Sequence, residues 1–200
     1  HDNTEAAIEH LVASLAKPPR VIDAGRITYT DAQGDESVRW FACMVSAGFD
    51  SVVNERANRM RHPKGPSRYT LALVLELVAL KPIPYRLVLD GTPLDTRAML
   101  VSVGNNVSLG GGMKVTPDAL LDDGLLDVLV VQPLGRVEFM RIFPRVFKGT
   151  HVTDPRVTIH RAKSIRIESD VAIAYADGER IGALPVHIDV VEASLRVLAD

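Results

Sequence analysis

The sequence is poor in cysteine and aromatic residues, and it lacks long apolar runs. Its single cysteine, Cys43, excludes a disulfide framework or a multi-cysteine zinc site within one chain. The longest apolar run, residues 71–80, is interrupted by Glu76 and is far shorter than the roughly 20 residues that span a bilayer. No signal peptide is recognisable. We therefore expect a reducing compartment and, at most, peripheral membrane contact.

A strong excess of one charge sign is also missing. The 23 basic and 25 acidic side chains leave a net charge of −2, which disfavours bulk nucleic-acid binding. Hydrophobic residues make up 46% of the chain and charged residues 24%, as in a globular protein with a sizeable core. We expect no nucleic-acid partner.

Short strands separated by turn signals dominate the pattern. Helices are expected at residues 5–16, 50–60, 67–80 and 136–147, the last perturbed by Pro144. Strands are expected at residues 21–30, 38–46, 85–89, 97–103, 125–132, 157–168, 171–176, 180–188 and 194–198. Such close spacing favours an antiparallel sandwich or barrel over a parallel βαβ sheet.

Two carboxylates flank a glycine in Asp177-Gly178-Glu179, between two predicted strands. In an extended chain, residues 177 and 179 point the same way, so both carboxylates can face one site. Such a pair can hold a cation or take a proton from a hydroxyl. The other interpretation is a hairpin turn, because Asp-Gly is a common turn signal.

A second acidic stretch, Asp122-Asp123-Gly124, precedes the predicted strand 125–132. A tight turn with two carboxylates and free carbonyls can bind a hard cation such as magnesium, although it lacks EF-hand spacing. A simple Asp-Gly turn remains the alternative. The glycine-rich segment 108–114 is a weak phosphate signal or a flexible connector.

Basic residues gather in the predicted helix 50–60 and just beyond it. Arg56, Arg59 and Arg61 precede Arg68, which begins the next predicted helix. They form either a solvated face or a phosphate clamp. The histidines show no metal-ligand spacing.

The order of these motifs resembles the C-terminal part of the bacterial diacylglycerol kinases, members of a lipid kinase family. The segments that carry the resemblance are residues 47–50, 56–61, 110–112, 117–127 and 177–179. Residues 146–151 and 175–178 together are most similar to the actinobacterial members. The family includes the sphingosine kinases and is more distantly similar to the NAD kinases.

The resemblance implies a two-domain enzyme. Its first domain carries a Gly-Gly-Asp-Gly-Thr nucleotide motif, which this sequence does not contain. The second is mainly antiparallel β with a few helices, an α+β fold. We accordingly expect residues 1–22 to be a helical remnant of the nucleotide-binding domain and residues 23–200 to be the β-sandwich. The last strand, 194–198, can belong with the first domain.

The resemblance also assigns roles to individual residues. Glu179 matches the proton acceptor for the lipid hydroxyl, and Asp177 matches a carboxylate used in base catalysis or magnesium binding. The division of roles between these two residues stays open.

A metal site and a phosphate contact follow from the same resemblance. Asp123 matches a structural magnesium ligand, joined by the main-chain carbonyls of Leu120 and Leu125. Arg68 resembles a phosphate-contacting arginine.

The expected function is the C-terminal half of an ATP-dependent kinase that converts diacylglycerol to phosphatidic acid. Mg²⁺ is the expected cofactor, ATP is held mainly by the other domain, and this chain alone is expected to be inactive. The expected location is the cytoplasm, at the inner face of the membrane. The protein can form a homodimer. The alternatives are a noncatalytic lipid- or partner-binding β-sandwich module and a kinase for a sphingoid lipid or NAD.

Overall fold

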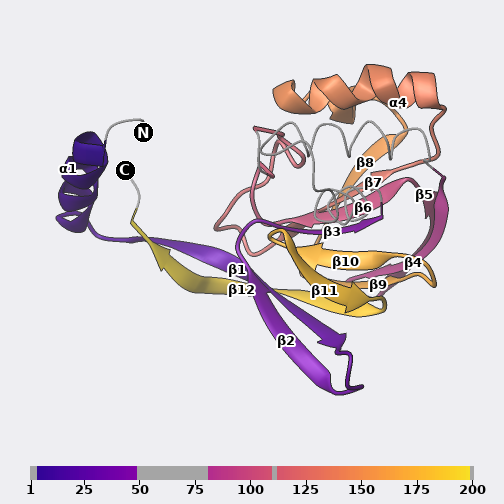
Figure 1. The fold of residues 1–200 in the computed structure, drawn as a ribbon, viewed down its shortest axis with the longest axis horizontal. Helices are drawn as coiled ribbons and strands as arrows, with labels where there is room; N and C mark the ends of the chain where they lie inside the picture. The colour runs from indigo at the N-terminus through magenta and orange to yellow at the C-terminus, as the bar shows by residue number, and fades with distance from the viewer. Residues whose placement is uncertain (1–3, 49–80, 110–111, 199–200) are drawn as a thin grey trace, which may run out of the picture.

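The computed structural model describes residues 4–48, 81–109 and 112–198 (Figure 1). In chain order its elements are α1 (Thr4–Leu15), β1 (Arg20–Thr30), β2 (Glu36–Phe41), β3 (Met44–Gly48), β4 (Ile83–Leu89), β5 (Thr92–Ala98), β6 (Leu100–Gly104), β7 (Leu126–Val131), α4 (Arg136–Ile142), the 3-10 helices η1 (Phe143–Lys148) and η2 (His151–Thr153), β8 (Val157–Ala162), β9 (Ser164–Glu168), β10 (Ile173–Ala176), β11 (Glu179–Ala183) and β12 (Val186–Val197).

The strands of the described residues form two six-stranded antiparallel sheets. Sheet A has the order β2-β1-β12-β9-β4-β5, and sheet B has the order β11-β10-β3-β6-β7-β8. The predicted antiparallel sandwich is therefore confirmed. Its main core lies between the sheets and includes Ile27, Leu87, Val128 and Ile188.

A second core covers the outer face of sheet B, beneath α4 and η1 (Figure 1). Strand β7 shows why both faces are apolar. Val128 and Val130 point into the main core, whereas Leu129 and Val131 belong to the second. Because successive side chains of a strand alternate between faces, a strand covered on both sides is a continuous apolar run.

Four predicted strands are wrong in the same way. Each divides into two strands, with one strand in each sheet: residues 38–46 into β2/β3, 97–103 into β5/β6, 157–168 into β8/β9 and 180–188 into β11/β12. The chain turns a corner from one sheet to the other. Hydrogen bonds from distant segments hold these corners, such as Met99 N–H to Val131 O at 2.7 Å, so local sequence patterns miss them.

Helix α1 confirms the predicted N-terminal helix, and it lies at the end of an arm formed by β1 and β12, near both chain ends (Figure 1). The proposed boundary at residue 22 falls inside β1. Strand β12 runs unbroken through residues 194–197 and pairs Val197 with Arg20, so the separate last strand expected from the sequence is part of it.

Pro144 divides the predicted helix 136–147 into α4 and the 3-10 helix η1, as the perturbation expected at this residue indicates. Within the part of the chain that the structure describes, no helix is long and apolar enough to cross a membrane.

Candidate functional site

Asp177 and Gly178 form the two-residue turn between β10 and β11. Their φ angles are 47° and 85°, the left-handed backbone of a tight hairpin turn. Asp177 is therefore not in an extended chain. The alternation of an extended chain therefore does not place the side chains of residues 177 and 179 on one side, and the hairpin interpretation describes the backbone correctly.

The Asp177 carboxylate accepts hydrogen bonds from three successive backbone amides. Its oxygens lie 2.8 Å from Ala42 N, 3.0 Å from Cys43 N and 2.8 Å from Met44 N. In return, Asp177 N–H donates to Met44 O at 2.9 Å. These amides form the corner between β2 and β3, so Asp177 supplies the acceptors that the corner needs.

The Glu179 carboxylate is in a different environment. Its side chain is 74% exposed and pairs with Arg39 at 3.0 Å across to β2. A shallow groove of about 380 Å³ opens beside the turn, lined by Ala24, Trp40, Phe41, Ala42, Asp177, Ser194 and Leu195. The Glu179 carboxylate is thus accessible to a ligand, whereas the Asp177 carboxylate is engaged with backbone.

The acidic loop contains Asp123, whose Oδ1 accepts from Leu125 N at 3.1 Å. Its other oxygen pairs with Arg161, which also approaches Asp127 at 3.7 Å. Asp127 is 2% exposed, and burial raises its pKa above the ordinary value, against the opposing effect of Arg161. Asp127 Oδ2 is buried without a hydrogen-bond partner among the described atoms.

These residues fit a hard cation in chemistry. Oxygen donors are what magnesium prefers, and a cation beside the unpartnered Asp127 oxygen would lower the cost of its burial. No group of three or more His, Cys, Asp or Glu side chains in the described segments could hold a metal. A magnesium ion would therefore depend on Asp123 with main-chain oxygens such as those of Leu120 and Leu125, and it would compete with Arg161.

A buried network joins the acidic loop to the β2/β3 corner. Asn105 is fully buried, and its Nδ2 donates to Asp23 O at 2.9 Å and to Ala42 O at 3.1 Å. The Asp23 carboxylate accepts from Gly124 N at 2.7 Å and from Ala193 N at 2.8 Å. The two acidic motifs are thereby connected through hydrogen bonds.

Sequence reasoning missed Asp23 and Asn105. Asp23 interrupts the predicted strand 21–30, and a charged residue in a strand's apolar start is a signal that could have been used. Asn105 follows β6 and resembles an ordinary loop residue in the sequence. The role of its side chain depends on segments more than 60 positions away.

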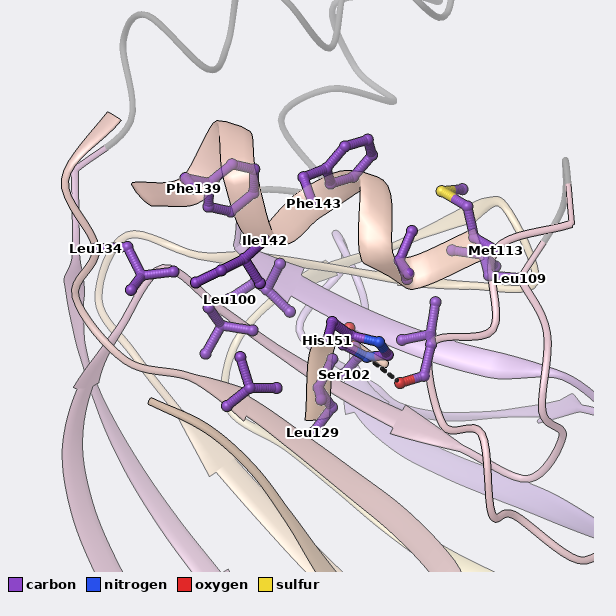
Figure 2. A pocket seen from close by; sticks show the side chains of 14 residues that line it. Leu100, Ser102, Leu109, Met113, Leu129, Leu134, Phe139, Ile142, Phe143 and His151 are labelled. Atoms are coloured by element: carbon purple, nitrogen blue, oxygen red, sulfur yellow. Dashed lines mark hydrogen bonds between the residues drawn. The ribbon is translucent and has the colours of Figure 1, made fainter. Parts of the chain in front are cut away.

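An apolar cavity of about 80 Å³ lies between sheet B and the helical segment (Figure 2). Its walls include Leu100, Leu109, Met113, Val115, Leu129, Val131, Leu134, Phe139, Ile142, Phe143, Val146 and Val157. In Figure 2, Phe139 and Phe143 lie on the helical side and Leu100 and Leu129 on the sheet side.

Two polar residues, Ser102 and His151, also line this cavity. His151 is 4% exposed, and its Nε2 lies 3.0 Å from Val115 O. Because a carbonyl only accepts, Nε2 carries the proton, which leaves Nδ1 as an acceptor, buried and without a partner among the described atoms. Burial lowers the pKa of His151, so the neutral ring is favoured.

Several predicted site residues lie outside the described residues. They are Arg56, Arg59, Arg61 and Arg68 of the basic cluster, and Gly110 and Gly111 of the glycine-rich segment.

Comparison with known protein families identifies the fold. Residues 43–199 match the domain described as "YegS C-terminal NAD kinase beta sandwich-like domain". The chain belongs to this family. A diacylglycerol kinase of Mycobacterium tuberculosis is 45% identical to this chain over 197 residues, covering 98% of the chain and 62% of that protein. A diacylglycerol kinase of Staphylococcus carnosus is 28% identical, covering 89% and 58%.

The YegS-type fold also agrees with solved structures. A diacylglycerol kinase from Bacillus anthracis has a TM-score of 0.65 at 19% identity, covering all of this chain and 60% of that one. The resemblance to the lipid kinase family is thus confirmed. The chain spans about three fifths of the length of these relatives, so a large part of each has no counterpart in these residues.

Proposed function

We propose that this chain is the lipid-binding C-terminal half of an ATP-dependent diacylglycerol kinase. The observation that carries the proposal is that the chain has both an apolar cavity and an accessible carboxylate, Glu179. Met44 belongs to the cluster around the cavity, and its N–H donates to Asp177, two residues before Glu179. A ligand with an apolar tail and a hydroxyl group suits both sites, because the tail matches the apolar cavity and the hydroxyl can give its proton to the Glu179 carboxylate.

In the proposed reaction, Glu179 accepts the proton of the lipid hydroxyl. The hydroxyl oxygen attacks the γ-phosphorus of ATP, and the bond between that phosphorus and the ADP oxygen breaks. Asp177 positions the hairpin through the β2/β3 corner, so its contribution is structural. Positioning and electrostatic stabilisation account for most of phosphoryl transfer catalysis.

A magnesium ion at the acidic loop would be held by Asp123 and the carbonyls of Leu120 and Leu125. Bound there, it would offset negative charge on the carboxylates or phosphate oxygens. Asp23 and Asn105 would connect that loop to the hairpin. Arg68 is proposed as a phosphate contact from the family resemblance.

The apolar cavity is proposed to receive part of an acyl chain. Most of its lining is aliphatic or aromatic, as in other sites for apolar ligands. ATP and membrane diacylglycerol meet at the cytoplasmic face of a membrane, which is the proposed location.

A substrate panel on the full-length protein tests the proposal. With ATP and Mg²⁺, long-chain diacylglycerol should be phosphorylated faster than sphingosine or NAD. The variant Leu129→Phe, which narrows the cavity, should raise KM for long-chain diacylglycerol more than for a short-chain one. Bound lipid without phosphate transfer would favour a noncatalytic module, and preferred turnover of sphingosine or NAD would reassign the substrate.

A further inference from the structure

The segment formed by α4 and η1 is apolar on two opposite sides. Phe139, Ile142 and Val146 point inward to the second core. On the other side, Val137, Met140 and Phe147 are 63%, 61% and 49% exposed. A helix on the surface of a soluble protein normally turns a polar face outward, so this outer side needs an explanation.

The exposed apolar residues follow one stripe. Val137, Met140, Pro144 and Phe147 are spaced by three, four and three positions, which brings them to one side of a helical segment. We call these four residues the outer stripe. Figure 1 shows α4 along the outer edge of the molecule, remote from α1 and the chain ends. All four residues are exposed, so the outer stripe lies on the surface.

Positive charge accompanies the outer stripe. Arg136, Arg141 and Lys148 are exposed beside it. Glu138 is the one acidic residue in the segment 134–148, and its carboxylate pairs with Arg156 at 2.5 Å. Arg156 also pairs with Asp154 at 2.9 Å. Since the segment 134–148 has four basic residues and one acidic residue, it presents apolar groups together with net positive charge.

Apolar side chains between basic ones suit the interface of an anionic bilayer. The apolar groups enter the boundary between headgroups and acyl chains, and the basic groups contact anionic headgroups. The position supports the same partner, because the inward residues of this segment form a wall of the apolar cavity. Among the described residues, this helical segment is what lies between the cavity and such a bilayer.

We propose that the outer stripe docks this protein on an anionic membrane, with Arg136, Arg141 and Lys148 on lipid headgroups. Docking there brings the cavity next to the acyl chains, so that a chain enters it without crossing water. The entry of an acyl chain into the cavity rests on the proposed lipid kinase function, whereas the membrane docking does not.

Vesicle flotation of the full-length protein, without ATP, tests the docking. Vesicles of phosphatidylcholine with one third phosphatidylglycerol should bind the wild-type protein more strongly than phosphatidylcholine alone. The double variant Val137→Asp/Met140→Asp should lower the partition coefficient at least tenfold. The matched control Val38→Asp changes an exposed apolar residue of β2, 50% exposed, and should bind like the wild type.

Two arginine variants test how much positive charge contributes to vesicle binding. Arg141→Ala should weaken binding to the anionic vesicles about fivefold, the usual contribution of one basic residue at such a surface. Arg97→Ala removes an exposed arginine of β5 and should leave binding unchanged. Thermal melts check that each variant is folded.

The outcomes separate docking from catalysis. Equal vesicle binding by Val137→Asp/Met140→Asp and the wild type would overturn the proposal. A wild type that binds neither kind of vesicle would also overturn it. In either case the outer stripe would be a protein contact. Predicted binding without any phosphorylation of diacylglycerol would refute the proposed function and leave the docking surface intact. If both the docking and the lipid kinase function are correct, Val137→Asp/Met140→Asp should lose kinase activity on diacylglycerol in vesicles. It should keep kinase activity on a water-soluble short-chain diacylglycerol.

Discussion

Two Asp-Gly turns in this sandwich have almost the same geometry. Asp90 and Gly91 have φ angles of 46° and 82°, and Asp177 and Gly178 have 47° and 85°. Each aspartate also hydrogen bonds to a strand corner elsewhere in the chain. Asp90 accepts from Lys163 N at 3.0 Å and from Ser164 N at 2.8 Å, where β8 passes into β9.

The difference between the turns lies in the next residue. Thr92 follows the first turn, and Glu179, exposed and paired with Arg39, follows the second. Both turns have an aspartate that hydrogen bonds to a strand corner, and the fold explains this feature. We therefore assign a structural role to Asp177 and expect the chemistry at Glu179.

The largest effect is expected from Glu179→Gln. Loss of a general base typically costs 10²–10⁴-fold in rate, so kcat of the full-length protein should fall by roughly that factor. Thr92→Ala, at the equivalent position of the other turn, should leave kcat unchanged. Lipid phosphorylation assays with ATP and Mg²⁺ measure both, and a fully active Glu179→Gln would move the base elsewhere.

Removing either aspartate should destabilise the protein. Hydrogen bonds to a charged acceptor contribute about 1.5–3 kcal/mol each when buried, and less in exposed turns like these. Asp177→Ala should lower the free energy of unfolding by about 1–3 kcal/mol, and Asp90→Ala by somewhat less because it holds fewer amides. Urea denaturation compares them; no loss in Asp177→Ala would contradict the structural role.

A third Asp-Gly pair, Asp123-Gly124, extends the comparison. Here the aspartate accepts from an amide of its own loop and pairs with Arg161 of β8, and the Asp23 carboxylate of β1 accepts from the amide of Gly124. If Asp123 binds magnesium, adding Mg²⁺ should raise the Tm of the full-length protein by a few degrees. Asp123→Asn should abolish that rise, whereas Asp122→Asn should retain it. Equal responses in both variants would place the ion elsewhere.

The smallest effect is expected from His151, in the second core. Its pKa is lowered from 6.5 in the folded protein, so the unfolded chain binds more protons just below that pH. The free energy of unfolding should therefore fall as the pH drops from about 7 to about 5. The slope should be reduced in His151→Gln, measured by urea denaturation at each pH. An unchanged slope would show that other groups cause it.

The sandwich could be predicted because closely spaced strands and turns are local signals. The two acidic motifs were found for the same reason. The corner at Ala42 and Cys43 could not be predicted, since it is stabilised by a carboxylate about 135 positions away. The cavity was also missed, because inward-facing residues of β6, β7 and α4 form it only after the chain has folded.

The structural role of Asp177 is tested most directly by hydrogen exchange of the Ala42, Cys43 and Met44 amides in the full-length protein. We expect slow exchange of these amides in the wild type and in Glu179→Gln, and fast exchange in Asp177→Ala. Equal protection of these amides in the wild type and in Asp177→Ala would contradict it, and the Asp177 carboxylate would again be a candidate for catalysis.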